Sequence, residues 1–553
     1  MSTPIVLGIH AYIHDSGACL ISPDCFVAIT EERLSRIKYD ASFPRKSIEY
    51  VLHAAGLKDI NDVDLVVFDL FEKQGEITHA GLRYLGYRGE VVSIKHHDSH
   101  AASAYFISPF KDAAVLIVDG AGSRGFESPP GNPVHYLDKS AGRMQEVQSI
   151  YRATDGEIQL IRRTYTTSKY PMGIGFLYGV SSEFLGFNKL EGGKLMGLAA
   201  YGNAGDYPFP NPLFTNFSGE MLIEYDHEAL AREDYDVMSG AIFCGIPQRK
   251  AGEPITAGHE AVARYVQDQT EEAMLVLAKN LYEITRCENI CLSGGVALNG
   301  IANKRILDET PFERIFIQPA ANDSGNALGC ALYGYHIVRG VKERRVMRDA
   351  FLGQRYDIFN IQKMLKATPQ IEFSRPNNLL RVVAEEIASG KIVGWFEGCC
   401  ETGPRALGHR SILADPRNKD MKDMLNRKVK HREPFRPYAP AVLEEFAAEY
   451  FDFSCSSPFM LMIGYAKAGK AEEIPAVVHV DGSARIQTVN AEGGRFRHLI
   501  SEFRSLTGVP MVVNTSFNVS GEPIVETPEN ALMCFLNTEM DLLVIEDFLV
   551  NKK

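Results

Sequence analysis

Residues 289–300 read NICLSGGVALNG, and residues 314–331 read RIFIQPAANDSGNALGCA. Each stretch opens with a short apolar run that predicts a strand, passes through a turn that contains glycine, and continues into a helical pattern. Two such units in one half of a chain are typical of a nucleotide-binding α/β fold, in which ligands lie at the strand ends. The two stretches therefore predict the α/β class and direct attention to the residues in their turns.

The same alternation extends toward both ends of the chain. Strands are expected at residues 5–10, 18–21, 26–29, 64–68 and 113–118 in the first third, and at 392–396, 510–514 and 541–545 in the last. Helical patterns lie at 45–55, 259–286, 379–389, 420–429 and 528–536. A hairpin followed by alternating helices and strands predicts mixed sheets.

A charged segment divides the chain into two α/β parts. Residues 340–356, GVKERRVMRDAFLGQRY, are weakly periodic and are the best candidate for a linker. We therefore expect a first domain at 1–345, a linker at 346–360 and a second domain at 361–553. Residues 208–255 are aromatic and irregular, which suits either an insertion over a ligand cleft or a plain surface excursion.

The composition excludes several classes of protein. The 553 residues include 58 Lys and Arg against 70 Asp and Glu, a net charge of −12, which disfavours a general nucleic-acid binder or a need for an anionic membrane surface. No stretch reaches the length of about 18 uncharged apolar residues that a membrane helix needs. The N-terminus lacks a basic signal-peptide region, and ten cysteines are too dilute for a disulfide scaffold. We expect a cytoplasmic protein without nucleic-acid or membrane partners.

Two histidines and two aspartates are candidate metal ligands. His96 and His100 lie four residues apart in the segment KHHDSHAASAYF, so on a helix both imidazoles share one face and can bind one cation. Asp119 and Asp323 each follow an apolar strand at a turn, where they can complete a site of two nitrogens and two oxygens. Such donors suit iron, manganese or zinc better than magnesium or copper(I). The alternative is that the aspartates only cap turns or helices.

The turn after residue 292 is a candidate phosphate site. It supplies backbone N–H groups in front of a helix, an arrangement that holds phosphates in many proteins. Gly294 and Gly295 in the turn, and Asn299 in the first turn of the helix, are therefore candidate nucleotide-binding residues. A two-glycine turn is also common without any ligand, and Asn299 can simply be exposed.

Residues 401–440 carry ten Lys and Arg against five acidic residues, in a chain that is acidic overall. Arg405 follows Gly-Pro and Arg436 precedes proline, so both lie on constrained turns, where a guanidinium suits bidentate phosphate recognition. Together with Lys430 they form a candidate anion site. Most of the other basic residues in 419–430 fit a solvated surface helix.

Further candidates lie outside that segment. Arg485 adds another guanidinium, and the strand end that carries Asn514 and Ser516 offers polar groups to a second phosphate or to a carbonyl. An ordinary polar turn explains this strand end equally well. His14 lies in the first hairpin, where a histidine is more often a turn residue than a base.

Eight motifs occur together and in the order found in one known family. They are GIHAYIHDSGACLI, EERLSRIKYD, HHDSHAASAY, EGGKLMGLAAYG, LSGGVALNG, NDSGNALGCAL, GPRALGHRSILADPR and VNTSFNVSGEPIV, and they span nearly all of the chain. On these motifs the chain resembles the O-carbamoyltransferases of antibiotic biosynthesis and nodulation-factor decoration, the NodU/CmcH family. The resemblance implies an actin/hexokinase-like (ASKHA) N-terminal domain, similar to TsaD-type threonylcarbamoyl transferases, and a YrdC-like α/β C-terminal domain.

The resemblance also implies a reaction. Carbamoyl phosphate and ATP would be co-substrates, carbamoyl-adenylate would form in the YrdC-like domain, and the first domain would pass the carbamoyl group to a hydroxyl of a small molecule such as a natural product or sugar. The family's metal, usually Fe(II), with Mn, Zn or Mg as alternatives, matches the ligands His96, His100, Asp119 and Asp323. Positions that hold carbamoyl phosphate and the adenylate match Arg405, Lys430, Arg436, Arg485, Asn514 and Ser516, with Lys38 contributing from the first domain.

His14 matches the residue beside the acceptor hydroxyl. Residues 203–257 fit no motif of the family, so the acceptor itself stays open. Three other functions also remain open: a tRNA threonylcarbamoyl-type modification enzyme, which would need a broad basic surface; an ASKHA-type small-molecule kinase, which would release ADP; and a non-catalytic ATP-binding protein. A homodimer is one expected assembly.

Overall fold

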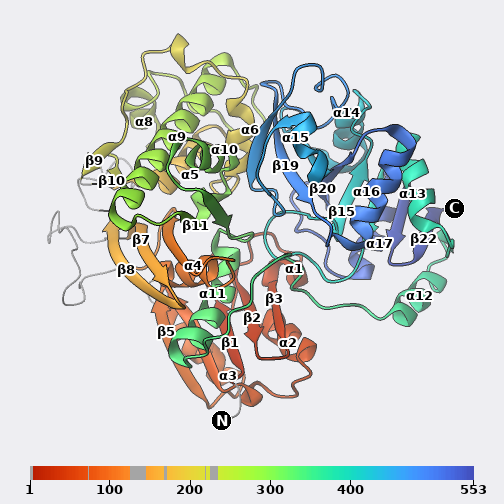
Figure 1. The fold of residues 1–553 in the computed structure, drawn as a ribbon, viewed down its shortest axis with the longest axis horizontal. Coiled ribbons are helices and arrows are strands. Elements are labelled where there is room, and N and C mark those ends of the chain that lie inside the picture. Colours follow the sequence, from red (N-terminus) through yellow and green to blue (C-terminus); the bar gives the residue numbers. More distant parts are fainter. Residues whose placement is uncertain (1–3, 72–73, 125–144, 167–170, 218, 225–233) are drawn as a thin grey trace. The chain divides into compact units, whose positions relative to one another are not determined.

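The computed structural model describes residues 4–553 except 72–73, 125–144, 167–170, 218 and 225–233 (Figure 1). Contacts between residues divide the chain into two compact units. The first comprises Met1–Tyr12, Cys19–Cys25 and Lys58–Met347, and the second comprises Ile13–Ala18, Phe26–Leu57 and Arg348–Lys553. Two short N-terminal pieces, which include His14 and Lys38, thus group with the C-terminal part. Both units mix helices and strands, which confirms the predicted α/β class.

Two five-stranded sheets run through the N-terminal part of the chain. The first has the order β3-β2-β1-β4-β5 and the second β8-β7-β6-β11-β12, so that each sheet places its third, second, first, fourth and fifth strand side by side. The two sheets thus share one strand order, which agrees with the expected ASKHA organisation. The strands are β1 (Val6–His10), β2 (Gly17–Ile21), β3 (Phe26–Thr30), β4 (Leu65–Leu70), β5 (Glu90–Lys95), β6 (Asp112–Val118), β7 (Glu146–Thr154), β8 (Glu157–Tyr165), β11 (Asn289–Ser293) and β12 (Arg314–Ile317).

Two central helices of the first unit pack closely because glycine leaves no side chain between their backbones. Helix α4 (His96–Tyr105) lies against α11 (Asn326–Tyr333), which also packs on β1. A Cβ at Gly329 of α11 would lie 2.0 Å from the carbonyl oxygen of Ser99 on α4. A Cβ at Gly8 of β1 would lie 2.0 Å from the carbonyl oxygen of Ala327. Because α11 packs this closely on α4, the turn before α11 lies near the buried face of α4.

The long helix α9 (Ala257–Thr285) packs against α6 (Gly192–Ala199) and α10 (Gly300–Glu309) (Figure 1). The sequence pattern places Asn299 in the first turn of a helix, whereas α10 begins only at Gly300. A short 3-10 turn, Gly295–Leu298, comes first, and Asn299 then caps α10 by accepting a hydrogen bond from the N–H of Ala302 at 3.2 Å. Of the helices in the described ranges, none combines the length and apolarity needed to cross a bilayer.

A ten-stranded sheet forms the core of the second unit, in the order β13-β22-β21-β14-β15-β20-β16-β19-β18-β17. Its central strands are buried along their whole length because helices and loops cover them. The strands are β13 (Ile371–Ser374), β14 (Val393–Phe396), β15 (Arg410–Ala414), β16 (Ala439–Leu443), β17 (Phe451–Asp452), β18 (Met462–Ala466), β19 (Ser483–Val489), β20 (Met511–Ser516), β21 (Leu542–Ile545) and β22 (Phe548–Lys552).

Its helices are α1 (Glu31–Ser35), α2 (Arg45–Ala54), α12 (Ile358–Lys366), α13 (Leu379–Ala388), α14 (Met421–Leu425), α15 (Ala447–Tyr450), α16 (Gly494–Thr507) and α17 (Pro528–Leu536). The other α-helices and strands of the described residues, all in the first unit, are α3 (Gln74–Tyr84), α5 (Ile174–Phe184), β9 (Thr215–Phe217), β10 (Glu220–Leu222) and α8 (Tyr235–Ala241). The last three lie in the 203–257 segment, of which residues 218 and 225–233 are outside the described residues.

Candidate active site

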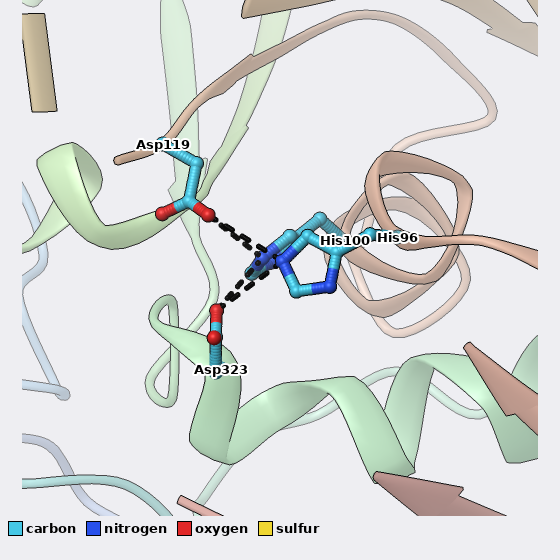
Figure 2. A group of neighbouring side chains, drawn as sticks. All are labelled: His96, His100, Asp119 and Asp323. Atoms are coloured by element: carbon cyan, nitrogen blue, oxygen red, sulfur yellow. Dashed lines mark ion pairs between the residues drawn. The ribbon is translucent and has the colours of Figure 1, made fainter. Parts of the chain in front are cut away.

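Two histidines of α4 and two aspartates from separate turns meet inside the first unit. His96 and His100 lie one turn apart, with ring centroids 4.8 Å apart. Nε2 of His96 lies 3.4 Å from a carboxylate oxygen of Asp119 and of Asp323 (Figure 2). Nε2 of His100 lies 3.9 Å from Asp119 and 3.4 Å from Asp323. The structure thus brings together all four predicted ligands, which we call the His/Asp cluster.

The His/Asp cluster has the donor set and the burial of a metal site. Its four donor atoms lie within 4.8 Å of one another, and all four residues are buried. Two carboxylates in so closed a space repel each other unless a cation lies between them. Burial disfavours the charged imidazole of His96, yet Asp323 and Asp119 outweigh it and raise the pKa of His96 well above its usual value. Two nitrogens and two oxygens in this setting fit iron, manganese or zinc.

The turn after β11 supports the His/Asp cluster directly. The N–H of Gly295 donates a hydrogen bond to Oδ1 of Asp119 at 2.8 Å, and Oγ of Ser293 lies 3.1 Å from Nδ1 of His100. Gly294 has a φ of +89°, and a Cβ there would lie 2.3 Å from the carbonyl oxygen of Val118. This position therefore requires glycine.

The donors of this predicted phosphate-binding turn are engaged within the first unit. The N–H of Gly294 donates to the carbonyl oxygen of Ala321 at 2.8 Å, and the N–H of Gly295 serves Asp119. Asn299, besides capping α10, donates from Nδ2 to Gln267 at 3.0 Å and is buried. The part of Gly294, Gly295 and Asn299 in nucleotide binding therefore stays a prediction.

Five cationic side chains of the second unit act on one another through their charges. Burial, followed by the charges of the neighbouring arginines, lowers the pKa of Arg485 well below its usual value. Burial and then Arg436 lower the pKa of Arg405 to about 10. Burial lowers the pKa of Lys430 well below its usual value, with Arg432 the largest charge contribution. We call this set the basic cluster: Arg405, Lys430, Arg432, Arg436 and Arg485.

The basic cluster carries more positive charge than its neighbours neutralise. Nη1 of Arg436 lies 3.8 Å from Oε2 of Glu433, which is the one ion pair of the cluster recorded in the described part of the chain. Among the same residues, Nε of Arg405 and Nε of Arg485 have no hydrogen-bond partner. Partly buried guanidinium groups with unused donors suit phosphate oxygens, which accept two parallel hydrogen bonds from one arginine.

Lys430 and Ser516, two predicted site residues, meet at the end of β20. Nζ of Lys430 donates to Oδ1 of Asn518 at 2.9 Å and to Oγ of Ser516 at 3.2 Å. Asn514 lies earlier on the same strand and is buried. Its Nδ2 donates to the carbonyl oxygen of Ala406 at 3.1 Å, so that Asn514 supports the residue after Arg405.

A buried carboxylate and a buried arginine fix the loop that carries Arg405. Oε1 of Glu401 accepts three backbone hydrogen bonds of 2.8–3.0 Å, from Leu407, His409 and Arg410. Nη2 of Arg33 donates to the carbonyl oxygen of Gly403 at 2.9 Å. Neither residue was predicted from the sequence, because neither belongs to a motif that signals a site by itself. Arg432 was counted among the basic residues of 401–440 but was not named as a site residue.

Two predicted residues from the N-terminal part of the chain lie in the second unit. The charge of Lys38 contributes to lowering the pKa of Lys430, and its Nζ lies 5.1 Å from the ring centroid of Tyr39. Nδ1 of His14 lies 3.5 Å from Oδ2 of Asp15, a buried residue with a φ of +66°. Backbone strain of this kind concentrates at functional sites. Lys38 therefore lies with the basic cluster, and His14 has a carboxylate beside it.

Comparison with known proteins identifies the family. The family model for the carbamoyltransferase N-terminus matches residues 5–85 and 83–332, and that for the carbamoyltransferase C-terminus matches residues 384–552. An uncharacterized protein of Synechocystis, sll1178, is 36% identical over 99% of this chain and 96% of its own length. The nodulation protein NolNO of Sinorhizobium fredii is 32% identical over 98% of this chain and 80% of its own. The nodulation protein NolO of Bradyrhizobium diazoefficiens is 33% identical over 83% of this chain and 79% of its own length. The chain therefore belongs to the carbamoyltransferase family and is an enzyme that transfers a carbamoyl group.

Proposed function

We propose that this carbamoyltransferase takes its carbamoyl group from carbamoyl phosphate, activates it as carbamoyl-adenylate with ATP, and passes it to a hydroxyl of a small-molecule acceptor. The observation that carries the proposal is the basic cluster. Carbamoyl phosphate and ATP are both anionic, so their phosphates repel when they approach. Preorganised cations offset this repulsion and stabilise the charge that develops on the reacting phosphates.

The first half-reaction consumes carbamoyl phosphate, ATP and water, and releases phosphate and pyrophosphate. Water first cleaves the bond between the phosphorus of carbamoyl phosphate and its bridging oxygen, which gives phosphate and carbamate. A carbamate oxygen then bonds to the α-phosphorus of ATP while the bond between that phosphorus and the oxygen leading to the β-phosphate breaks. Arg405 and Arg485 bind phosphate oxygens through donors that the protein leaves unused. Lys430, Arg436 and Lys38 add positive charge beside them, and Ser516 adds a hydroxyl.

In the second half-reaction the acceptor oxygen bonds to the carbamoyl carbon, AMP leaves, and the hydroxyl proton passes to a base. His14 is the proposed base, because an alcohol is a weak nucleophile at neutral pH and needs a group within hydrogen-bond reach to take its proton. His96, His100, Asp119 and Asp323 hold the metal, which when bound supplies a Lewis acid toward oxygen ligands.

The spent nucleotide tests this proposal. The purified protein is incubated with ATP, carbamoyl phosphate and a panel of hydroxylated metabolites; chromatography separates the nucleotides, and mass spectrometry detects a carbamoylated product. We expect AMP and pyrophosphate to form only when carbamoyl phosphate is present. Release of ADP would indicate a kinase, and no ATP consumption would leave only nucleotide binding; either result would overturn the proposal.

A further inference from the structure

Asp69 joins two histidines behind the His/Asp cluster. Oδ1 of Asp69 lies 2.8 Å from Nδ1 of His10, and Oδ2 lies 2.7 Å from Nδ1 of His96. His10 ends β1 and Asp69 lies near the end of β4, and these strands pair in parallel with Ile9 opposite Phe68. All three side chains are buried. The strand register thus places one carboxylate between two imidazoles.

These contacts determine which way each imidazole presents its second nitrogen. An ionised carboxylate only accepts hydrogen bonds, so each histidine donates to Asp69 through Nδ1–H. Each oxygen of the Asp69 carboxylate faces one imidazole nitrogen, at 2.8 Å for His10 and 2.7 Å for His96. Nε2 of each ring then faces away from Asp69.

Both outward nitrogens face Asp323. Nε2 of His96 lies 3.4 Å from Oδ1 of Asp323, and Nε2 of His10 lies 3.9 Å from Oδ2. Among the described residues, Nε2 of His10 has no hydrogen-bond partner. His10, Asp69, His96 and Asp323 therefore close a buried ring of alternating imidazoles and carboxylates, two members of which belong to the His/Asp cluster.

We propose that Asp69 is the positioning residue of the metal site: it fixes the tautomer and orientation of His96 directly, and through His10 it braces Asp323. Metal-bound histidines commonly donate their other N–H to a carboxylate, and loss of that carboxylate weakens metal binding about 10- to 100-fold. The inference rests on the metal binding given under the proposed function. It adds two residues, His10 and Asp69, that do not themselves belong to the four ligands.

The test measures the affinity for Co²⁺, a metal with a visible spectrum that reports on its ligands. The metal-free full-length protein is titrated with Co²⁺ in competition with a chelator, for the wild type, Asp69→Asn and His10→Gln. The matched control is His97→Gln: His97 is buried on the same helix between the two ligands, but its Nδ1 lies 2.7 Å from Oγ of Ser149. Circular dichroism verifies folding.

We expect Asp69→Asn to weaken Co²⁺ binding by about 10- to 100-fold and to alter the visible spectrum. His10→Gln is expected to weaken binding less, and His97→Gln to leave both unchanged. An affinity of Asp69→Asn equal to that of the wild type overturns the inference while the four-ligand site stands. If Asp69→Asn does not fold, His10→Gln decides, and an unchanged affinity and spectrum in it overturn the inference. A wild type that binds no Co²⁺ overturns both the inference and the metal assignment, whereas AMP formation is measured separately.

Discussion

Nη2 of Arg33 donates a hydrogen bond of 2.9 Å to the carbonyl oxygen of Gly403, across 370 positions of sequence. Helix α1 thereby supports the turn that presents Arg405 two residues later. From inside the same loop, Oε1 of Glu401 holds three backbone N–H groups. The position of the Arg405 guanidinium therefore depends on a carboxylate and an arginine that need never touch a substrate.

Removing the carboxylate of Glu401 is expected to loosen this loop. Glu401→Ala leaves two buried N–H groups and one part-buried N–H group without their acceptor, and each loss in a buried setting costs about 1–3 kcal/mol. We expect the KM for carbamoyl phosphate in AMP formation to rise more than kcat falls, with a lower free energy of unfolding. Glu401→Gln keeps an acceptor oxygen and is expected to recover most of the affinity. An unchanged KM in Glu401→Ala would show that the loop does not position Arg405.

Arg405→Ala is expected to lower carbamoyl phosphate-dependent AMP formation by at least about 30-fold, because truncating one partner of a hydrogen-bonded charge pair costs about 2–5 kcal/mol. The matched control is Arg417→Ala. Arg417 lies in the same basic segment, but Asp415 already pairs with it at 2.7 Å. We expect the control to form AMP at close to the normal rate, as measured by chromatography. Equal rates in the two variants would refute the anion site.

Local patterns predicted the His/Asp cluster because each of its members carries its own signal. His96 and His100 follow helical spacing, and Asp119 and Asp323 follow apolar strands whose ends meet on one side of a parallel arrangement. The repeated strand–turn–helix units at 289–300 and 314–331 likewise depend on neighbouring residues only. These features can be predicted because they depend on short-range periodicity, which is visible in the sequence itself.

Other features depend on contacts between distant residues. The hairpin of β7 and β8 and the strands β15, β16, β18 and β19 were not predicted, because tertiary packing decides strand formation more than local preference does. Gly294 looked like part of a phosphate-binding turn, yet its close approach to Val118 and the bond from Gly295 to Asp119 give this turn a role beside the His/Asp cluster. Nothing near Arg33 or Asp69 in the sequence indicates the partners they find.

His409 makes the stability of the second unit depend on pH. Burial, only partly opposed by Glu401, lowers the pKa of His409 to about 4, and its Nδ1 lies 2.7 Å from the carbonyl oxygen of Cys399. The unfolded chain binds a proton near pH 6.5 while the folded one does not, so stability falls as the pH drops from 6.5 toward 4. At pH 5 this group alone lowers the free energy of unfolding by about 2 kcal/mol.

Urea unfolding checks this pH dependence. The chain has a single tryptophan, Trp395, which is buried in β14 of the second unit, so its fluorescence follows that unit. Between pH 7 and pH 5, the wild type is expected to lose about 2 kcal/mol more of its free energy of unfolding than His409→Gln, because glutamine does not titrate at this position. Equal losses would mean that His409 is protonated in the folded state as readily as in the unfolded one.

His100→Ala is expected to separate the two half-reactions. The substitution removes one of four ligands, and Nε2 of His100 faces both Asp119 and Asp323, so the protein should no longer retain Co²⁺ through dialysis. His100 belongs to the first unit and the basic cluster to the second. The rate of AMP formation from ATP and carbamoyl phosphate should therefore stay within about two-fold of the wild-type rate. The carbamoylated acceptor should fall below detection, because a metal ion supplies several kcal/mol of transition-state stabilisation. The fluorescence of Trp395 verifies that the second unit stays folded.

If AMP formation and acceptor carbamoylation fell by the same factor, the His/Asp cluster would be needed for activation as well. The assignment of the two half-reactions to separate groups of residues would then be wrong.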